Sequence, residues 1–207
     1  IPSQLDDKNR RFVLADLAKT ARQNRYESSF LWLADAGVAL SCYNVNAPSV
    51  PLAANAKHSL FKLFMGDVGL LCASSLGNVQ FDILQGDLEV NMGSIVENVV
   101  AQELVAHGFN LHYFNSKRQG EVDFVVQRGK AALPIEVKSG NDWQRHRALS
   151  NILDVEEWGI ERAYVLCKGN VAREGKVPYL PLYMTMFLEQ EHLPEGMRYE
   201  VDLSALG

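Results

Sequence analysis

Two short runs of alternating apolar and polar residues, joined by a turn, constrain this chain most. The segment GEVDFVVQRGKAALPIEVKSG contains these runs at residues 121–127 and 132–138. Alternation with a period of two is typical of β-strands, and Arg128-Gly129 between the runs is a turn signal. The sequence therefore predicts a β-hairpin on which Glu136 and Lys138 share one face.

The place of Asp123 depends on the length of the hairpin loop. A loop with an even number of residues pairs Gln127 with Lys130 and sets Asp123 opposite Pro134. Asp123 then shares a face with Glu136 and lies diagonal to it, roughly 7–8 Å away at the backbone. An odd loop would send Asp123 to the other face.

Two carboxylates beside a lysine suggest a particular chemistry. Carboxylate oxygens are hard ligands that suit Mg²⁺ or Mn²⁺ better than zinc. With Lys138 beside them, Asp123 and Glu136 fit phosphodiester hydrolysis, in which a cation polarises the phosphate and an ammonium orients the nucleophile. The alternative for so short a motif is the solvated face of an edge strand.

The surrounding pattern favours the site. Residues 93–108 predict a helix that carries Glu97 in its first turns and ends at Gly108. After this helix the sequence predicts a strand at 111–114, the hairpin, a helix at 143–158 and a buried strand at 162–167. The predicted order is helix, three strands, helix, strand.

Glu97 lies on the first predicted helix, EVDF supplies Asp123, and IEVK supplies Glu136 and Lys138. With these residues in place, the predicted order of helices and strands resembles the PD-(D/E)XK nuclease superfamily. The whole chain also resembles the uncharacterised C-terminal region of bacterial and archaeal AAA-type ATPases. The segments that carry this second resemblance are IPSQL (1–5), YESSFLWLADAG (26–37), FKLFMGDVGLL (61–71), GSIVENVVAQEL (93–104), EVDFVV and IEVKSG.

The resemblance implies a restriction-endonuclease-like α/β domain with a central mixed sheet flanked by helices. It implies that Glu97, Asp123, Glu136 and the Val137 carbonyl hold the metal, and that Lys138 is the catalytic lysine. It does not imply activity, because nuclease-like folds in such ATPases also serve as binding or assembly modules. A non-catalytic accessory module that binds nucleic acid or protein is therefore the alternative function.

The first ninety residues predict a separate module. Helical patterns at 11–22 and 26–36 precede β-runs at 38–45 and 60–65, with a loop at 46–57 between the strands. This arrangement is winged-helix-like, and the resemblance points the same way. We expect modules at 1–90 and 91–207, and a packing role rather than DNA reading for the first, because its candidate recognition helix contains no arginine. Asp67 is expected to cap a further helix that begins near Gly66.

Charge and composition limit the partners. A net charge of −5 argues against sequence-independent binding of DNA over the whole surface, so any contact with nucleic acid must be local. Candidate contacts are Lys117 and Arg118 before the hairpin and Arg145 and Arg147 after it, although all four also fit solvated surface charge.

The remaining sequence features concern compartment and cofactors. The cysteines at 42, 72 and 167 read as free thiols in a reducing compartment, and the chain contains no transmembrane-length apolar run, so we expect a cytoplasmic protein. No phosphate-binding GxxxxGK[ST] loop is present, so ATP would bind only to an N-terminal ATPase module outside this chain. DNA and that module are the expected partners, and an oligomeric state is left open.

Overall fold

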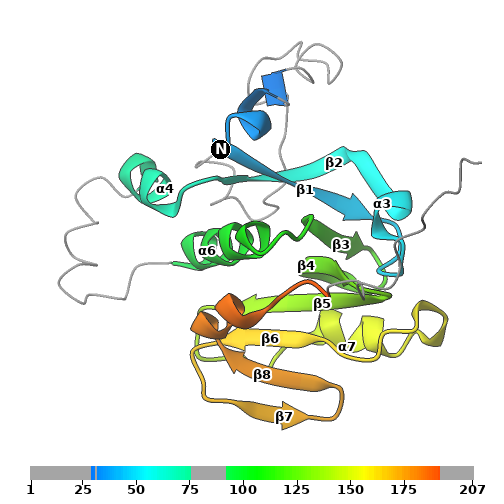
Figure 1. Ribbon diagram of the computed structural model, residues 1–207. Helices are drawn as coiled ribbons and strands as arrows, with labels where there is room; N and C mark the ends of the chain where they lie inside the picture. Colours follow the sequence, from blue (N-terminus) through cyan, green and yellow to red (C-terminus); the bar gives the residue numbers. More distant parts are fainter. Residues whose placement is uncertain (1–28, 31, 76–91, 192–207) are drawn as a thin grey trace, which may run out of the picture.

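The computed structural model describes residues 29–30, 32–75 and 92–191, which are arranged around one β-sheet (Figure 1). The strands are β1 (Ala39–Val45), β2 (Ala56–Met65), β3 (His112–Ser116), β4 (Gly120–Arg128), β5 (Ala131–Lys138), β6 (Tyr164–Cys167), β7 (Ala172–Glu174) and β8 (Val177–Pro181). The helices are α3 (Leu52–Asn55), α4 (Val68–Ser75), α6 (Gly93–Ala106) and α7 (Arg147–Leu153), with 3-10 turns η2 (Glu156–Trp158) and η3 (Leu182–Phe187). Residues 29–30 and 32–35 are also helical.

The eight strands form one mixed sheet in the order β2-β1-β3-β4-β5-β6-β8-β7. The pairs β1–β3, β5–β6 and β6–β8 are parallel, and the other neighbours are antiparallel. Parallel neighbours need a connection that crosses over the sheet, and α6 and α7 lie in two such connections. This arrangement confirms the predicted α/β class with a mixed sheet flanked by helices.

The sheet continues across the predicted boundary between residues 1–90 and 91–207. Tyr43 pairs with His112 and Val45 with Phe114, so β1 adds directly to β3. The division into two modules stays a prediction, but the strands of both segments share one sheet. The helix predicted at 11–22 lies outside the described residues, as do parts of the helix predicted at 26–36.

Helices cover both faces of the sheet. On one face, called the α6 face, Leu104 of α6 packs with Phe124 and Ile135. On the opposite α7 face, Leu149 of α7 packs with Val165. The middle of the sheet is therefore buried on both sides, which explains the uninterrupted apolar runs Phe124–Val126 on β4 and Tyr164–Cys167 on β6.

Polar side chains fix α4 and α6 to the end of β2. Asn98 accepts a hydrogen bond from the Met65 N–H at 2.7 Å and donates one to the Met65 carbonyl at 3.0 Å. Gln102 accepts from the Val68 N–H. Asp67 accepts from the Leu70 N–H at 2.7 Å and so caps α4, which confirms the predicted cap.

Two predicted elements differ in extent from the structure. The helix predicted at 143–158 is wrong in length, because α7 covers only Arg147–Leu153. Trp143 and Trp158 suggested a longer helical stripe, but both pack against the α7-face core from outside the helix. The predicted loop at 46–57 contains α3, and β2 begins at Ala56 rather than at residue 60.

Cys42 and Cys167 are buried free thiols, as predicted, and Cys72 is half-buried. None of the helices in the described part of the chain is long and apolar enough to cross a membrane.

Candidate active site

The hairpin of β4 and β5 has an even loop, but its register differs from the predicted one. Arg128 pairs with Ala131 and Phe124 with Ile135, so only Gly129 and Lys130 lie between the paired strands. The predicted pairing of Gln127 with Lys130 is wrong, because Gln127 pairs with Ala132, two residues further along the chain. The two loop residues are therefore 129–130 and not 128–129. The parity is unchanged. Continued by one residue, the register sets Asp123 opposite Glu136 rather than diagonal to it.

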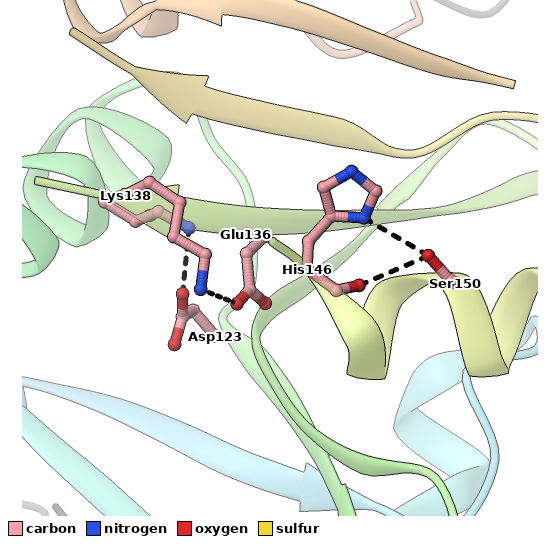
Figure 2. Close-up of polar contacts among 6 residues, drawn as sticks. Asp123, Glu136, Lys138, His146 and Ser150 are labelled. Carbon is pink, nitrogen blue, oxygen red and sulfur yellow. Dashed lines mark hydrogen bonds and ion pairs between the residues drawn. The ribbon is translucent and has the colours of Figure 1, made fainter. Parts of the chain in front are cut away.

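Followed away from the hairpin turn, the pairing of β4 with β5 ends one residue short of Asp123. The last paired residues are Phe124 and Ile135, and β4 also shows a register shift against β3 between His112 and Phe114. Asp123 bridges the gap with its side chain, because its Oδ2 accepts a hydrogen bond from the Val137 N–H at 2.8 Å (Figure 2). Irregular strands of this kind re-aim side chains next to functional sites.

Glu136 and Lys138 lie on β5 and form an ion pair at this gap (Figure 2). Their partners on β6 are Val165 and Cys167, which belong to the α7-face core, so both side chains lie on that face. Lys138 Nζ is 2.7 Å from Glu136 Oε1. Glu136 Oε2 is buried and has no hydrogen-bond partner among the described residues.

The environment of Glu136 favours its neutral form. Only 6% of the residue is exposed. Burial raises the pKa of Glu136 to about 8; the negative charge of Asp123 raises it as well, while Lys138 opposes the shift. Burial contributes more to this shift than repulsion from Asp123 does. A cation bound at Glu136 would favour the ionised form.

The other two predicted ligands occupy different positions. In an extended strand the N–H and C=O of one residue lie on the same edge. Since the Val137 N–H points to Asp123, the Val137 carbonyl lies on the edge that faces β4. Glu97 is buried in α6, whereas the contacts that join Asp123, Glu136 and Lys138 come from β4 and β5. Its role in metal binding stays a prediction.

A buried cation from the first half of the chain also lies near this site, and sequence reasoning missed it. Lys62 of β2 is 0% exposed, and its Nζ lies 2.7 Å from Glu121 Oε1 on β4 and 4.7 Å from the centre of the Tyr113 ring. Asn115 donates a hydrogen bond to the other oxygen of Glu121. Lys62 pairs with Cys42 of the α6-face core, so it approaches β4 from the face opposite to Lys138.

A signal for Lys62 was present in the sequence. Its segment, LFKLFM, places a lysine inside a strand with apolar neighbours on both sides. A lysine in such a strand is seldom buried unless it is paired. The pairing with Glu121 could not be read from the sequence, since it spans β1 and β3.

The four basic residues proposed for nucleic-acid contact are all exposed. Lys117 and Arg118 occupy the turn before β4, and Arg147 begins α7. Arg145 lies 3.8 Å from Asp142 in an exposed ion pair. Contact between these residues and nucleic acid stays a prediction.

His146, between two of these arginines, turns inward instead. Its Nε2 lies 2.7 Å from the Tyr179 hydroxyl, which donates to Glu174 at 3.2 Å. Its Nδ1 lies 3.3 Å from Ser150 Oγ (Figure 2). Burial, and then Glu174, raise the pKa of Tyr179. The sequence gives no local signal for this contact, because Tyr179 is 33 residues away from His146.

Comparison with protein families divides the chain in two. Residues 92–184 match a family described as "Domain of unknown function (DUF4143)". Residues 1–80 match a second family, "Domain of unknown function (DUF8612)". No curated protein and no solved structure matches the chain.

The DUF4143 match contains Glu97, Asp123, Glu136 and Lys138, whereas Lys62 lies in the DUF8612 match. The two matched segments therefore meet at β4 through the Lys62–Glu121 ion pair. Within residues 29–30, 32–75 and 92–191, no group of three or more histidine, cysteine, aspartate or glutamate side chains is arranged to hold a metal ion.

Proposed function

We propose that this chain carries a divalent-metal-dependent DNA phosphodiesterase site, a nuclease site, formed by Asp123, Glu136 and Lys138. The observation that carries the proposal is the gap between β4 and β5. There, two carboxylates from facing strands meet beside a lysine, and the buried Glu136 Oε2 has no hydrogen-bond partner among the described residues. Burying an oxygen in this way is costly unless a ligand satisfies it.

The donor atoms at the gap fit magnesium or manganese. Asp123, Glu136 and the Val137 carbonyl offer only oxygen, which suits these hard cations. Glu97 is the proposed fourth ligand, acting directly or through water. When bound, the cation would polarise the phosphate and lower the pKa of an attacking water.

The protein's own residues would perform the other steps. Lys138 is half-buried and already lies 2.7 Å from Glu136, so its ammonium stands where it can orient the nucleophile and stabilise developing negative charge. Asp123 is fixed by the Val137 N–H, which keeps its second oxygen available at the gap. Burial of Glu136 excludes bulk water from one side of the site.

A plasmid-nicking assay tests the proposal. Supercoiled DNA is incubated with the protein in Mg²⁺ or Mn²⁺ and with the variants Glu136→Gln and Lys138→Met. We expect nicking by the natural protein and a loss of about a hundredfold or more in either variant. Glu157→Gln changes an exposed carboxylate on η2 and is the matched control. Nicking that both site variants retain in full would contradict these roles.

Metal binding separates the enzyme from the non-catalytic alternative. A ligand that binds the folded state raises the melting temperature by mass action. We expect millimolar Mg²⁺ or Mn²⁺ to stabilise the natural protein but not Asp123→Asn. Stabilisation without nicking would favour the accessory module, in which the same face binds a partner. No stabilisation would contradict the metal site.

The finer architecture is part of the same proposal. We infer a PD-(D/E)XK nuclease-like arrangement for residues 91–207 and a winged-helix-like arrangement for residues 1–90. Because the family matched by residues 92–184 is often found in AAA-type ATPases, we also infer that this chain serves as the C-terminal part of such an ATPase. Sequencing the gene upstream for a phosphate-binding loop tests that inference.

A further inference from the structure

A cavity of about 270 Å³ lies on the α6 face, at the end of β5 away from Glu136 and Lys138. Arg128, Arg162 and Arg173 line it together with Tyr164, Glu161 and Glu191. The lining therefore carries three positive and two negative charges, a local excess of one positive charge on a chain whose net charge is −5. This cavity shares no residue with the candidate active site.

Strand positions place Arg128 and Arg173 on the α6 face, and Arg162 lies just before β6. Arg128 follows Phe124 and Val126 of the α6-face core at intervals of two residues. Arg162 comes two residues before Tyr164, the first residue of β6, and lines the cavity with it. Arg173 lies on β7 and pairs with Pro178 at the edge of the sheet. The arginines thus come from three segments that converge only because the sheet is assembled.

Backbone carbonyls hold two of the guanidinium groups in place. Arg128 donates its Nε–H to the Glu189 carbonyl at 3.1 Å, and Arg173 donates its Nε–H to the Gly175 carbonyl at 3.0 Å. Since Nε is occupied in both, the outer Nη edges remain for a ligand. Among the described residues, none of the three arginines forms an ion pair, although Glu161 and Glu191 line the same cavity.

We propose that this cavity is an anion site that binds a phosphate group. Guanidinium forks match phosphate oxygens with paired hydrogen bonds, and a tetrahedral phosphate has enough oxygens to accept from several forks at once. A planar carboxylate has only two oxygens and would leave most of the donors unused. The phosphate could belong to a small molecule, whose single phosphate offers three or four terminal oxygens, or to the backbone of a nucleic acid, whose successive phosphodiesters each offer two.

Calorimetric titration of the natural protein tests the site, with inorganic phosphate in one arm and a short single-stranded DNA in the other. Both arms are run at constant ionic strength and without divalent metal, so that the proposed phosphodiesterase site plays no part. We expect phosphate to bind in the millimolar range or tighter. Binding of both probes points to a small phosphate compound as a sufficient ligand, and binding of DNA alone assigns the phosphodiester backbone. Failure of both probes to bind would overturn the proposal.

Substitutions locate the binding. The triple variant Arg128→Gln, Arg162→Gln, Arg173→Gln should weaken binding of whichever probe binds by at least about tenfold. Arg128→Lys should weaken it too, because lysine keeps the charge but loses the planar fork. Arg145→Gln removes an exposed arginine elsewhere and should leave the affinity for inorganic phosphate unchanged. Equal affinity in the triple variant and the natural protein would overturn the site.

A folding control keeps the result interpretable. Arg162 is exposed, so Arg162→Gln alone should preserve the melting temperature of the phosphate-free protein. If this well-folded variant binds phosphate several-fold more weakly, the loss reflects the cavity and not unfolding. If it binds with unchanged affinity, Arg162 is not part of the site and the three-arginine proposal is wrong.

Discussion

Glu136 shows how the surroundings of one residue set its chemistry. Its pKa is raised from 4.5 to about 8, first by burial and then by Asp123. Between these two pH values the folded chain binds more protons at this position than the unfolded chain. The free energy of unfolding therefore falls as pH rises through this window, because the ionised carboxylate is less favourable in the fold.

Replacing Glu136 should remove this pH dependence. In metal-free buffer, Glu136→Gln keeps the size and a neutral side chain, so its stability should change less between pH 5 and pH 8. We expect the natural protein to lose on the order of a few kcal/mol relative to the variant over that range. Urea denaturation at several pH values measures the difference, and parallel pH profiles would show that Glu136 ionises normally.

The buried pair of Lys62 and Glu121 makes an asymmetric prediction. Lys62 is 0% exposed, whereas 29% of the Glu121 side chain is exposed. Removing Glu121 leaves a buried ammonium without its carboxylate, but removing Lys62 leaves a carboxylate that water can still reach. We expect Glu121→Leu to destabilise the fold by about 3 kcal/mol and Lys62→Met by much less. Chemical denaturation compares the two, and equal costs would contradict the argument.

At the scale of elements, glycine allows the ends of β1 and β2 to approach closely. A Cβ at Gly66 would lie 1.7 Å from the Gly37 carbonyl oxygen, which is backbone and cannot rotate away. Gly159 has a φ of 60° but open space around it. Gly66→Ala should therefore cost several kcal/mol, whereas Gly159→Ala should cost only about 1 kcal/mol of backbone strain. Thermal melting ranks the two variants, and the reverse order would be inconsistent with this packing.

The attachment of α6 depends on one amide. Asn98 is fully buried and satisfies both the N–H and the carbonyl of Met65. Asn98→Leu leaves two buried backbone groups without partners, so we expect a loss of about 2–4 kcal/mol. Gln102→Leu removes a single half-buried bond and should cost about 1 kcal/mol. Similar losses in the two variants would show that Asn98 has no special role.

The elements differ in how well their sequence predicts them. α6 was predicted closely, because its apolar positions repeat with helical spacing. The length of α7 was not, because Trp143 and Trp158 extend the apolar pattern while packing from outside that helix. The sequence left the parity of the hairpin loop open, and the pairing expected for an even loop was wrong by two residues, since Arg128 pairs with Ala131 and Gln127 with Ala132. β7 was missed because its three residues are all exposed.

At the scale of the whole molecule, the continuous sheet couples the two halves of the chain. Without residues 1–91, β3 would lose its parallel partner β1, and Glu121 would lose Lys62. We expect the fragment 92–207 to aggregate or to melt far below the full chain, because a central strand would become an exposed edge. Circular dichroism and gel filtration of the fragment test this, and a monomer with the stability of the full chain would contradict it.

The amino-acid pattern alone determined the strand and helix order of residues 93–167 and the placement of Glu136 and Lys138 on one face. These follow from local periodicity, which each segment carries within itself. Only the tertiary structure decided that β1 joins β3, that Lys62 reaches Glu121, and that Glu136 is buried enough to shift its pKa. Those features depend on contacts between residues far apart in the chain, and on the loss of water that such contacts cause.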